Sequence, residues 1–149
     1  MPKLSAGILL FRFIDTYPEV LLFHHGGPYW AGKDVWTIAK GEINENEKPL
    51  DAAKRELEEE TGIRIKGKLI ELTPVIQKNK KTVFAWGIEQ DFNPAEVKSN
   101  FFEIEWPPAS GQKKQFPEID KAAWFSISEG KERIMPSQVP LLNEIERHI

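Results

Sequence analysis

Short apolar runs separated by turn-forming residues dominate the hydrophobic pattern of this chain. The runs at 6–13, 20–24 and 122–126 predict β-strands. The polar segment at 15–19 contains Pro18 and predicts a turn, so the first two strands are expected to pair as a hairpin.

The run at 82–89 is apolar on both of the faces that a strand presents. One face carries Val83, Ala85 and Gly87, and the other carries Phe84, Trp86 and Ile88. A strand with two apolar faces is buried by layers on both sides. The pattern therefore predicts an α/β/α sandwich, in which helices cover each face of a sheet.

Less regular segments complete the predicted elements. The sequence predicts a short strand at 35–38, strand material at 64–77 interrupted near Gly67 and by Pro74, a strand at 101–106, a proline- and glycine-rich loop at 107–114, and two short helices divided at Pro136. Ser137 is the expected N-cap of the second of these helices. Its apolar positions, expected to pack on the sheet, are Leu141, Leu142 and Ile145.

A further helix is predicted between Pro49 and Gly62. Proline suits the first turn of a helix, and glycine suits the position after the last turn. Leu50, Ala53 and Leu57 fall at i, i+3 and i+7 and form one apolar stripe.

The adjoining face of this helix carries three carboxylates, Glu56, Glu59 and Glu60, at i, i+3 and i+4. Like charges at this spacing cost about 0.2–0.5 kcal/mol per pair. Negative charge near a helix C-terminus is also disfavoured by the helix dipole. Arg55 offsets only part of this cost, whereas a Mg²⁺ ion, which prefers carboxylate oxygens, would reverse it. The alternative is an acidic face that is merely solvated.

Composition narrows the class of protein. The chain has 149 residues, 40% of them hydrophobic and 29% charged, which is typical of one globular domain spanning 1–149. It has no cysteine, so disulfides, thiolate nucleophiles and Cys-based zinc sites are excluded. The net charge of −3 argues against duplex nucleic acid as a partner. No apolar run reaches the roughly 18–20 residues that span a membrane, and the N-terminal run is too short for a signal peptide, so we expect a cytoplasmic protein without a membrane partner.

The residues around the acidic face follow a longer pattern, Gly-x5-Glu-x7-Arg-Glu-U-x-Glu-Glu-x-Gly-U, in which U is apolar. Its constrained positions are Gly41, Glu47, Arg55, Glu56, Leu57, Glu59, Glu60, Gly62 and Ile63. This pattern resembles the signature box of the Nudix hydrolases, and it is a specific motif because so many positions are constrained. Shorter segments, Ser5-Ala6-Gly7, Glu105-Trp106-Pro107-Pro108 and Phe116-Pro117-Glu118, are similar to a poorly characterised bacterial branch of predicted NTP pyrophosphohydrolases.

The resemblance implies a fold and a chemistry. The fold is an α+β Nudix-type α/β/α sandwich, with a mixed sheet that contains mostly antiparallel strands between helices. The chemistry is Mg²⁺-dependent hydrolysis of a phosphoanhydride bond in a nucleoside diphosphate linked to another group, with Mn²⁺ as a substitute metal. A nucleoside triphosphate is the leading substrate, and a small nucleotide or polyphosphate is the expected partner.

The resemblance also implies roles for individual residues. Glu56 and Glu60 would be the main metal ligands, together with the carbonyl of Gly41. Glu59 would be a further ligand or the general base, and Glu118 a second candidate for either role. Arg55 would orient the cluster by ion pairing, with support from Glu47. As a glycine, Gly41 also allows an unusual backbone conformation and the close approach of a ligand.

Substrate contacts are predicted on two segments before the box. Lys40 is a candidate phosphate contact, with a solvated lysine as the alternative. In the glycine-rich loop at 25–34, Tyr29 or Trp30 could stack on a base, or the two aromatic rings could simply cover the sheet edge. For His24 and His25 we expect one packed and one solvated side chain rather than a metal site.

Other functions remain open at this point. A dinucleoside polyphosphate (Ap4A-type) hydrolase, a non-catalytic nucleotide-binding sensor and an acidic interaction module are the alternatives. Family branches specific for ADP-ribose or for dinucleoside polyphosphates tend to carry a proline or a tyrosine after the box, and neither residue occurs at Lys78 or at 79–81. A homodimer is an open alternative for the assembly.

Overall fold

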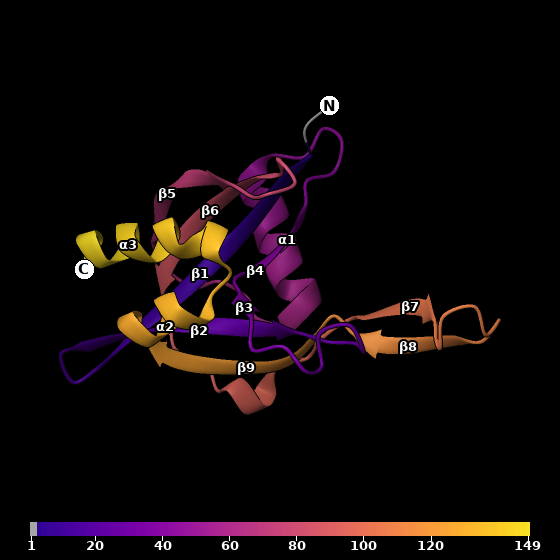
Figure 1. Cartoon of the computed structure of the whole chain (residues 1–149). Helices are drawn as coiled ribbons and strands as arrows, with labels where there is room; N and C mark the ends of the chain where they lie inside the picture. The colour runs from indigo at the N-terminus through magenta and orange to yellow at the C-terminus, as the bar shows by residue number, and fades with distance from the viewer. Residues whose placement is uncertain (1–2) are drawn as a thin grey trace.

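The computed structural model describes residues 3–149 and is built around one mixed sheet (Figure 1). Five strands follow the order β3-β2-β1-β6-β5, while β4 also pairs with β1, and β9 with β2. β1 and β6 are parallel, and the other pairs in this sheet are antiparallel. The strands are β1 (Leu4–Ile14), β2 (Tyr17–His25), β3 (Trp36–Thr37), β4 (Ala39–Glu42), β5 (Leu69–Ile76), β6 (Thr82–Glu89) and β9 (Ile119–Ser126).

Helices cover both faces of the sheet, as Figure 1 shows, which confirms the predicted α+β sandwich with a mixed sheet. α1 (Pro49–Thr61) packs on one face, and α2 (Ile127–Arg133) and α3 (Val139–His148) lie on the other. Two short 3₁₀ helices, Pro94–Glu96 and Pro136–Gln138, complete the helical elements of the described residues. No helix within residues 3–149 has both the length and the apolar character needed to cross a membrane.

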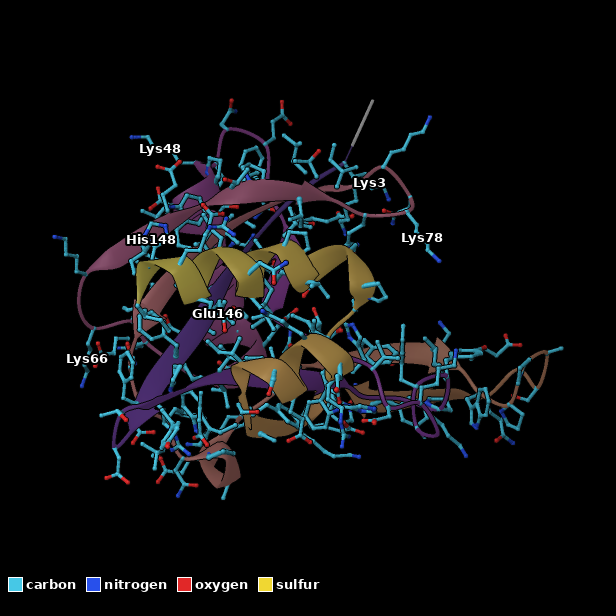
Figure 2. All side chains as sticks on the ribbon, turned by 60° about the vertical axis from the view of Figure 1, so that its left-hand side comes forward. Lys3, Lys48, Lys66, Lys78, Glu146 and His148 are labelled. Atoms are coloured by element: carbon cyan, nitrogen blue, oxygen red, sulfur yellow. The ribbon has the colours of Figure 1, made fainter. Side chains whose placement is uncertain are left out.

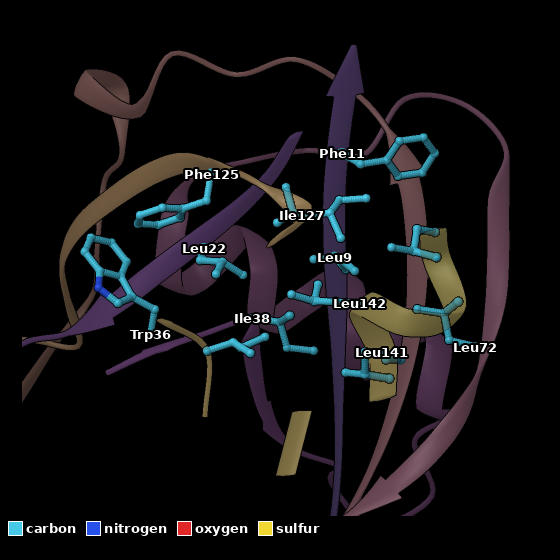
Figure 3. Close-up of a cluster of buried hydrophobic side chains, with 14 of the residues drawn as sticks. Leu9, Phe11, Leu22, Trp36, Ile38, Leu72, Phe125, Ile127, Leu141 and Leu142 are labelled. Carbon is cyan, nitrogen blue, oxygen red and sulfur yellow. The ribbon is translucent and has the colours of Figure 1, made fainter. Parts of the chain in front are cut away.

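The two faces of the sheet carry two separate hydrophobic clusters. Along β1, Leu9 and Phe11 belong to the cluster under α2 and α3, whereas Ile8 and Leu10 belong to the cluster under α1. Figure 3 shows the first cluster, in which Leu141 and Leu142 of α3 reach the sheet. Since successive side chains of a strand point to opposite faces, a strand covered on both sides must be apolar throughout. The double apolar pattern of β6 has the same cause.

α1 has the predicted bounds. Pro49 is its first residue, and Gly62 ends it in the left-handed conformation (φ 81°), where its N–H donates to the carbonyl of Glu58 (2.8 Å). Ala53 and Leu57 are fully buried against the sheet, so the apolar stripe determines which side of the helix turns inward. The adjoining face carries the carboxylates, of which Glu56 lies against Gly41 of β4.

Two local predictions are wrong. β2 already begins at Tyr17, within the predicted turn, and Ser137 is not a cap, because the N-cap of α3 is Gln138. The strand predicted at 35–38 is present as β3, and β4 follows it and pairs with β1. The predicted interruption at Pro74 is a register shift between Leu72 and Val75 within a continuous β5.

A separate two-stranded hairpin projects from one end of the sandwich (Figure 1). Its strands are β7 (Phe101–Glu105) and β8 (Lys113–Pro117), and the second was expected to be loop at its start. The root of the hairpin is tied to α1 because the N–H of Asn100 donates to the carbonyl of Glu59 (3.2 Å). Lys78, on the turn between β5 and β6, points into solvent (Figure 2).

Candidate active site

Arg55 connects the acidic side chains of the box. Its guanidinium donates to Glu47 through Nε (2.9 Å) and Nη2 (3.0 Å), and to Glu56 (2.8 Å) and Glu59 (3.1 Å) through Nη1. It also donates to the main-chain carbonyl of Glu42 (3.1 Å). Hydrogen bonds from Arg55 hold the pKa of the Glu47 carboxyl below its usual value, and those same bonds raise the pKa of Arg55. Arg55 therefore holds α1 against the β4–α1 loop and orients two of its glutamates.

Gly41 lies directly against the carboxylate of Glu56. A Cβ at position 41 would overlap the Glu56 carboxylate group, so the two residues are in close contact across β4 and α1. Gly41 does not adopt a positive φ, unlike Gly27, Gly62, Gly67 and Gly111. Gly41 therefore does not use the unusual backbone conformation that glycine allows, and glycine is needed there for space.

Glu60 and Glu118 are close enough to Glu56 for its charge to act on both of them. Burial raises the pKa of Glu60 to about 8, and the negative charges of Glu56 and Glu118 add to this shift. Burial, followed by the charge of Glu56, also raises the pKa of Glu118. The charge of Glu56 acts on the pKa of both other carboxyls, so α1 and the residue before β9 place these carboxylates near one another in a partly buried region.

Glu118 is held in position through its main chain. Its N–H donates to the carbonyl of Asn100 (2.9 Å), and its own carbonyl accepts from the N–H of Gly26 (2.9 Å). A side chain at Gly26 would overlap the backbone carbonyl of Pro117, so this contact requires glycine. The Gly26-Gly27 pair was the sequence signal for such a close backbone approach.

Lys40 is next to this acidic region and is half-buried. Burial lowers its pKa, and Lys81 lowers it further, whereas Glu60 and Glu56 act in the opposite direction. His25 is close to Lys40, and it is partly buried rather than solvated: burial, followed by the charge of Lys40, lowers its pKa to about 4. A neutral imidazole and a lysine thus lie beside the glutamates.

The glycine-rich loop brings aromatic rings close to this region. Trp30 stacks on His25 with ring centroids 4.8 Å apart, and Lys33 lies over the Trp30 ring at 5.2 Å. Tyr29 is 59% exposed and contacts Trp106 of the projecting hairpin edge-on, at 5.4 Å. In the sequence, Trp106 stood out only as part of the segment Glu105-Trp106-Pro107-Pro108. Its contact with Tyr29 was not predicted, because the hairpin brings the two residues together.

His24 is buried and has a structural role in the same loop. Its Nδ1 is 2.8 Å from a carboxylate oxygen of Asp120, and its Nε2 is 2.6 Å from the carbonyl of Lys33. The pair ties the end of the loop to β9, two residues after Glu118. Asp120 carries no local sequence signal for this role, because His24 and Asp120 lie 96 residues apart in the chain.

The donor set of the site fits a hard divalent cation. Among residues 3–149, no three His, Cys, Asp or Glu side chains are already grouped as a metal centre. Mg²⁺, however, usually takes only one or two carboxylates and completes its shell with water and substrate phosphates. Glu56 and Glu60, together with the main chain of Gly41, offer oxygen ligands of this kind. Glu59 is less well placed, since its side chain is 48% exposed and bonded to Arg55.

Comparison with known proteins identifies the class to which this fold and site belong. The family model described as NUDIX domain matches residues 1–145. This chain belongs to the NUDIX domain family, which confirms the resemblance of its box.

Individual similar proteins agree with this assignment. Nudix hydrolase 6 of Arabidopsis thaliana is 32% identical over 125 residues, covering 83% of this chain and 39% of that protein. An RNA pyrophosphohydrolase of Bartonella henselae is 45% identical over 58 residues, covering 30% of this chain and 34% of that protein. The chain thus spans about a third of the length of the first curated relatives it matches. Among solved structures, a C. elegans Ap4A hydrolase binary complex has a TM-score of 0.70 at 21% identity, covering 98% of this chain and 96% of that chain, and shows the shared fold.

Proposed function

We propose that this protein is a Mg²⁺-dependent hydrolase that cleaves a phosphoanhydride bond in a nucleoside diphosphate linked to another group. The observation that carries the proposal is the contact of the Glu56 carboxylate with Gly41, beside Glu60 and Glu118. The hydrolase names of similar proteins support it, and Mn²⁺ is expected to substitute for Mg²⁺. The proposal treats 1–149 as one catalytic domain.

Each part of the site has a role in this reaction. Glu56, Glu60 and the carbonyl of Gly41 would hold the metal. A bound Mg²⁺ would neutralise phosphate charge and lower the pKa of a bound water. Lys40 is placed to contact a substrate phosphate as a point charge.

The general base must be a carboxylate that is free to accept the proton of the attacking water and is not already paired with a cation. Glu59 accepts a hydrogen bond from Arg55, whereas Glu118 is partly buried among the acidic side chains. We therefore propose Glu118 as the general base, ahead of Glu59. Water attacks phosphorus, its proton passes to the carboxylate of Glu118, and the bond from phosphorus to the bridging oxygen breaks.

A hydrolysis panel in Mg²⁺ tests the proposal. The compounds are nucleoside triphosphates (oxidised ones included), dinucleoside polyphosphates, ADP-ribose, 5′-triphosphate RNA and diphosphoinositol phosphates. Turnover should fall by at least roughly 10²-fold in Glu60→Gln, since misplacing a reacting group by about 1 Å already costs that much. Glu58→Gln is the matched control, because Glu58 is on the same helix but is 51% exposed and paired with Arg64.

The panel also separates the alternative functions. Nucleotide binding without hydrolysis in either Mg²⁺ or Mn²⁺ would identify a sensor instead of an enzyme. Absence of Mn²⁺ affinity in a calorimetric titration would contradict the metal site and favour an interaction module.

A further inference from the structure

The hairpin formed by β7 and β8 has two different faces. Phe102 lies opposite Phe116, and Ile104 lies opposite Lys114, so these four side chains share one face. Phe101 and Glu103 lie on the other face and are exposed. The first face is therefore mainly apolar, with a lysine at its outer part.

The apolar face of the hairpin is turned toward the glycine-rich loop. The Phe102 ring occupies the space beside Gly27, where an added Cβ would lie 2.8 Å from it. Further out, Trp106 contacts Tyr29 of the loop. Loop and hairpin thus form one continuous surface that starts at Glu118, the residue after β8, and runs outward.

This surface offers aromatic rings at two distances from the acidic site. Trp30 stacks on His25, which is close to Lys40, so the first ring is adjacent to the proposed phosphate contact. Trp106 is further away. Its main-chain N–H donates to the carbonyl of Gln112 (2.8 Å). Gln112 lies six residues before Glu118, so an extended strand would separate these two residues by about 20 Å.

Positive charge accompanies these rings. Lys33 lies over Trp30, and Lys114 is exposed on the apolar face of the hairpin. Aromatic rings interleaved with lysines bind nucleotides by stacking on the bases and by pairing with the phosphates. A base next to the hydrolysed phosphates would reach Trp30, whereas Trp106 lies further out on the hairpin and faces a more distant part of a longer ligand.

We propose that the Tyr29–Trp106 pair binds a second nucleoside of the substrate, beyond the nucleoside nearest to the hydrolysed bond. This inference rests on the proposed function, and it narrows the substrate to compounds with two bases. Two kinds of substrate share this chemistry: a dinucleoside polyphosphate, and a short 5′-phosphorylated nucleotide chain. Tyr29 and Trp106 are then specificity-determining residues.

Binding without metal tests the inference independently of catalysis. In EDTA, fluorescence anisotropy compares a 3′-fluorescein-labelled dinucleotide with a labelled mononucleotide. Trp106→Ala should weaken dinucleotide binding by roughly 5- to 150-fold, the range that loss of one stacked base spans, and leave mononucleotide binding unchanged. Phe101→Ala is the matched control: Phe101 is 64% exposed on the opposite face of the same hairpin, and its removal should change neither affinity. Trp106→Phe keeps a ring and should retain most of the affinity.

Hydrolysis in Mg²⁺ then distinguishes the two sources of the second base. Trp106→Ala should raise KM for diadenosine tetraphosphate, or for a 5′-triphosphorylated dinucleotide, without changing turnover of ATP. An equal effect on one-base and two-base ligands, or no effect on either, overturns the inference even if the enzyme hydrolyses nucleotides. If instead no compound is hydrolysed and Trp106→Ala still selectively weakens dinucleotide binding, the second-base site stands and the proposed catalytic function fails.

Discussion

The carboxylate of Glu56 occupies the space beside the Cα of Gly41 that a larger residue would need. This contact joins β4 to α1 at the centre of the acidic site. The obstructing atoms belong to the far end of a flexible side chain, so a larger residue at position 41 would displace Glu56 before it disturbed the backbone.

Gly41→Ala should therefore separate stability from metal binding. We expect a free energy of unfolding lowered by about 1 kcal/mol at most, the low end of the cost of adding a methyl group to a packed site. Mn²⁺ affinity and turnover should fall by at least roughly 10²-fold, because the Glu56 carboxylate moves. Thermal unfolding and calorimetric Mn²⁺ titration measure the two effects. Unchanged Mn²⁺ affinity would show that Glu56 is not a ligand.

Arg55→Lys tests how the cluster is oriented. A lysine keeps the charge but cannot reach Glu47, Glu56 and Glu59 with one planar group. Turnover and Mn²⁺ affinity should fall by about 10- to 100-fold, as is typical when a partner of a metal ligand is lost. Arg64→Lys is the control, since the Arg64 side chain is 80% exposed and its ion-pair partner within residues 3–149 is Glu58. Equal effects of the two variants would contradict an orienting role for Arg55.

The pH dependence of stability should report on Glu60. Its folded-state pKa of about 8 exceeds the ordinary value of 4.5, so the folded protein keeps a proton that the unfolded chain releases. This contribution to stability is complete below pH 4.5 and is lost as the pH rises through 8. His25 acts in the opposite sense: its pKa of about 4 lies below the ordinary 6.5, so its contribution is complete above pH 6.5 and is lost as the pH falls through 4.

The window from pH 6.5 to 8.5 therefore isolates Glu60. In EDTA, the melting temperature of the wild type should fall by several degrees across this window, and Glu60→Gln should show a smaller fall. Added Mg²⁺ should stabilise the wild type more at pH 8.5 than at pH 6.5, because it binds the ionised carboxylate. Identical pH profiles for the two proteins in EDTA would exclude a buried, protonated Glu60.

Local signals account for the parts of the fold that the sequence predicted. Pro49, Gly62 and the spacing of Ala53 and Leu57 determine the bounds and the buried side of α1 without help from distant residues. The double apolar pattern of β6 likewise required two covering layers. Both features follow from residues that are close together in the chain.

Features that depend on distant partners were missed. β8 has the sequence Lys-Lys-Gln-Phe-Pro, which carries little strand signal of its own and becomes a strand by pairing with β7. Gly41 was assigned a conformational role, because only the packing of α1 on β4 reveals that the Glu56 carboxylate needs the space. Glu118, by contrast, was a candidate from the resemblance, although its position near α1 depends on how the hairpin root joins Asn100 and Gly26.

Glu118, rather than Glu59, is expected to be the general base. Glu59 was the leading candidate from the resemblance, but its side chain is 48% exposed and its carboxylate already accepts a hydrogen bond from Arg55 (3.1 Å). Burial and the charge of Glu56 raise the pKa of Glu118, which makes it a better proton acceptor than an ordinary carboxylate. Glu118→Gln should lower kcat by roughly 10²–10⁴-fold with little change in KM, and Glu59→Gln by less than about 10-fold.

The pH–rate profile distinguishes a base from a merely structural glutamate. Loss of the base should remove the acidic limb of the kcat profile in Glu118→Gln, whereas Glu59→Gln should keep that limb. Gly26→Ala gives an independent check, because a Cβ at Gly26 would push against the Pro117 carbonyl and shift Glu118 without changing its chemistry. This variant should lower kcat while retaining the acidic limb. If Glu59→Gln loses the limb and Glu118→Gln retains it, the base is Glu59, and the hairpin root serves only to position the loop.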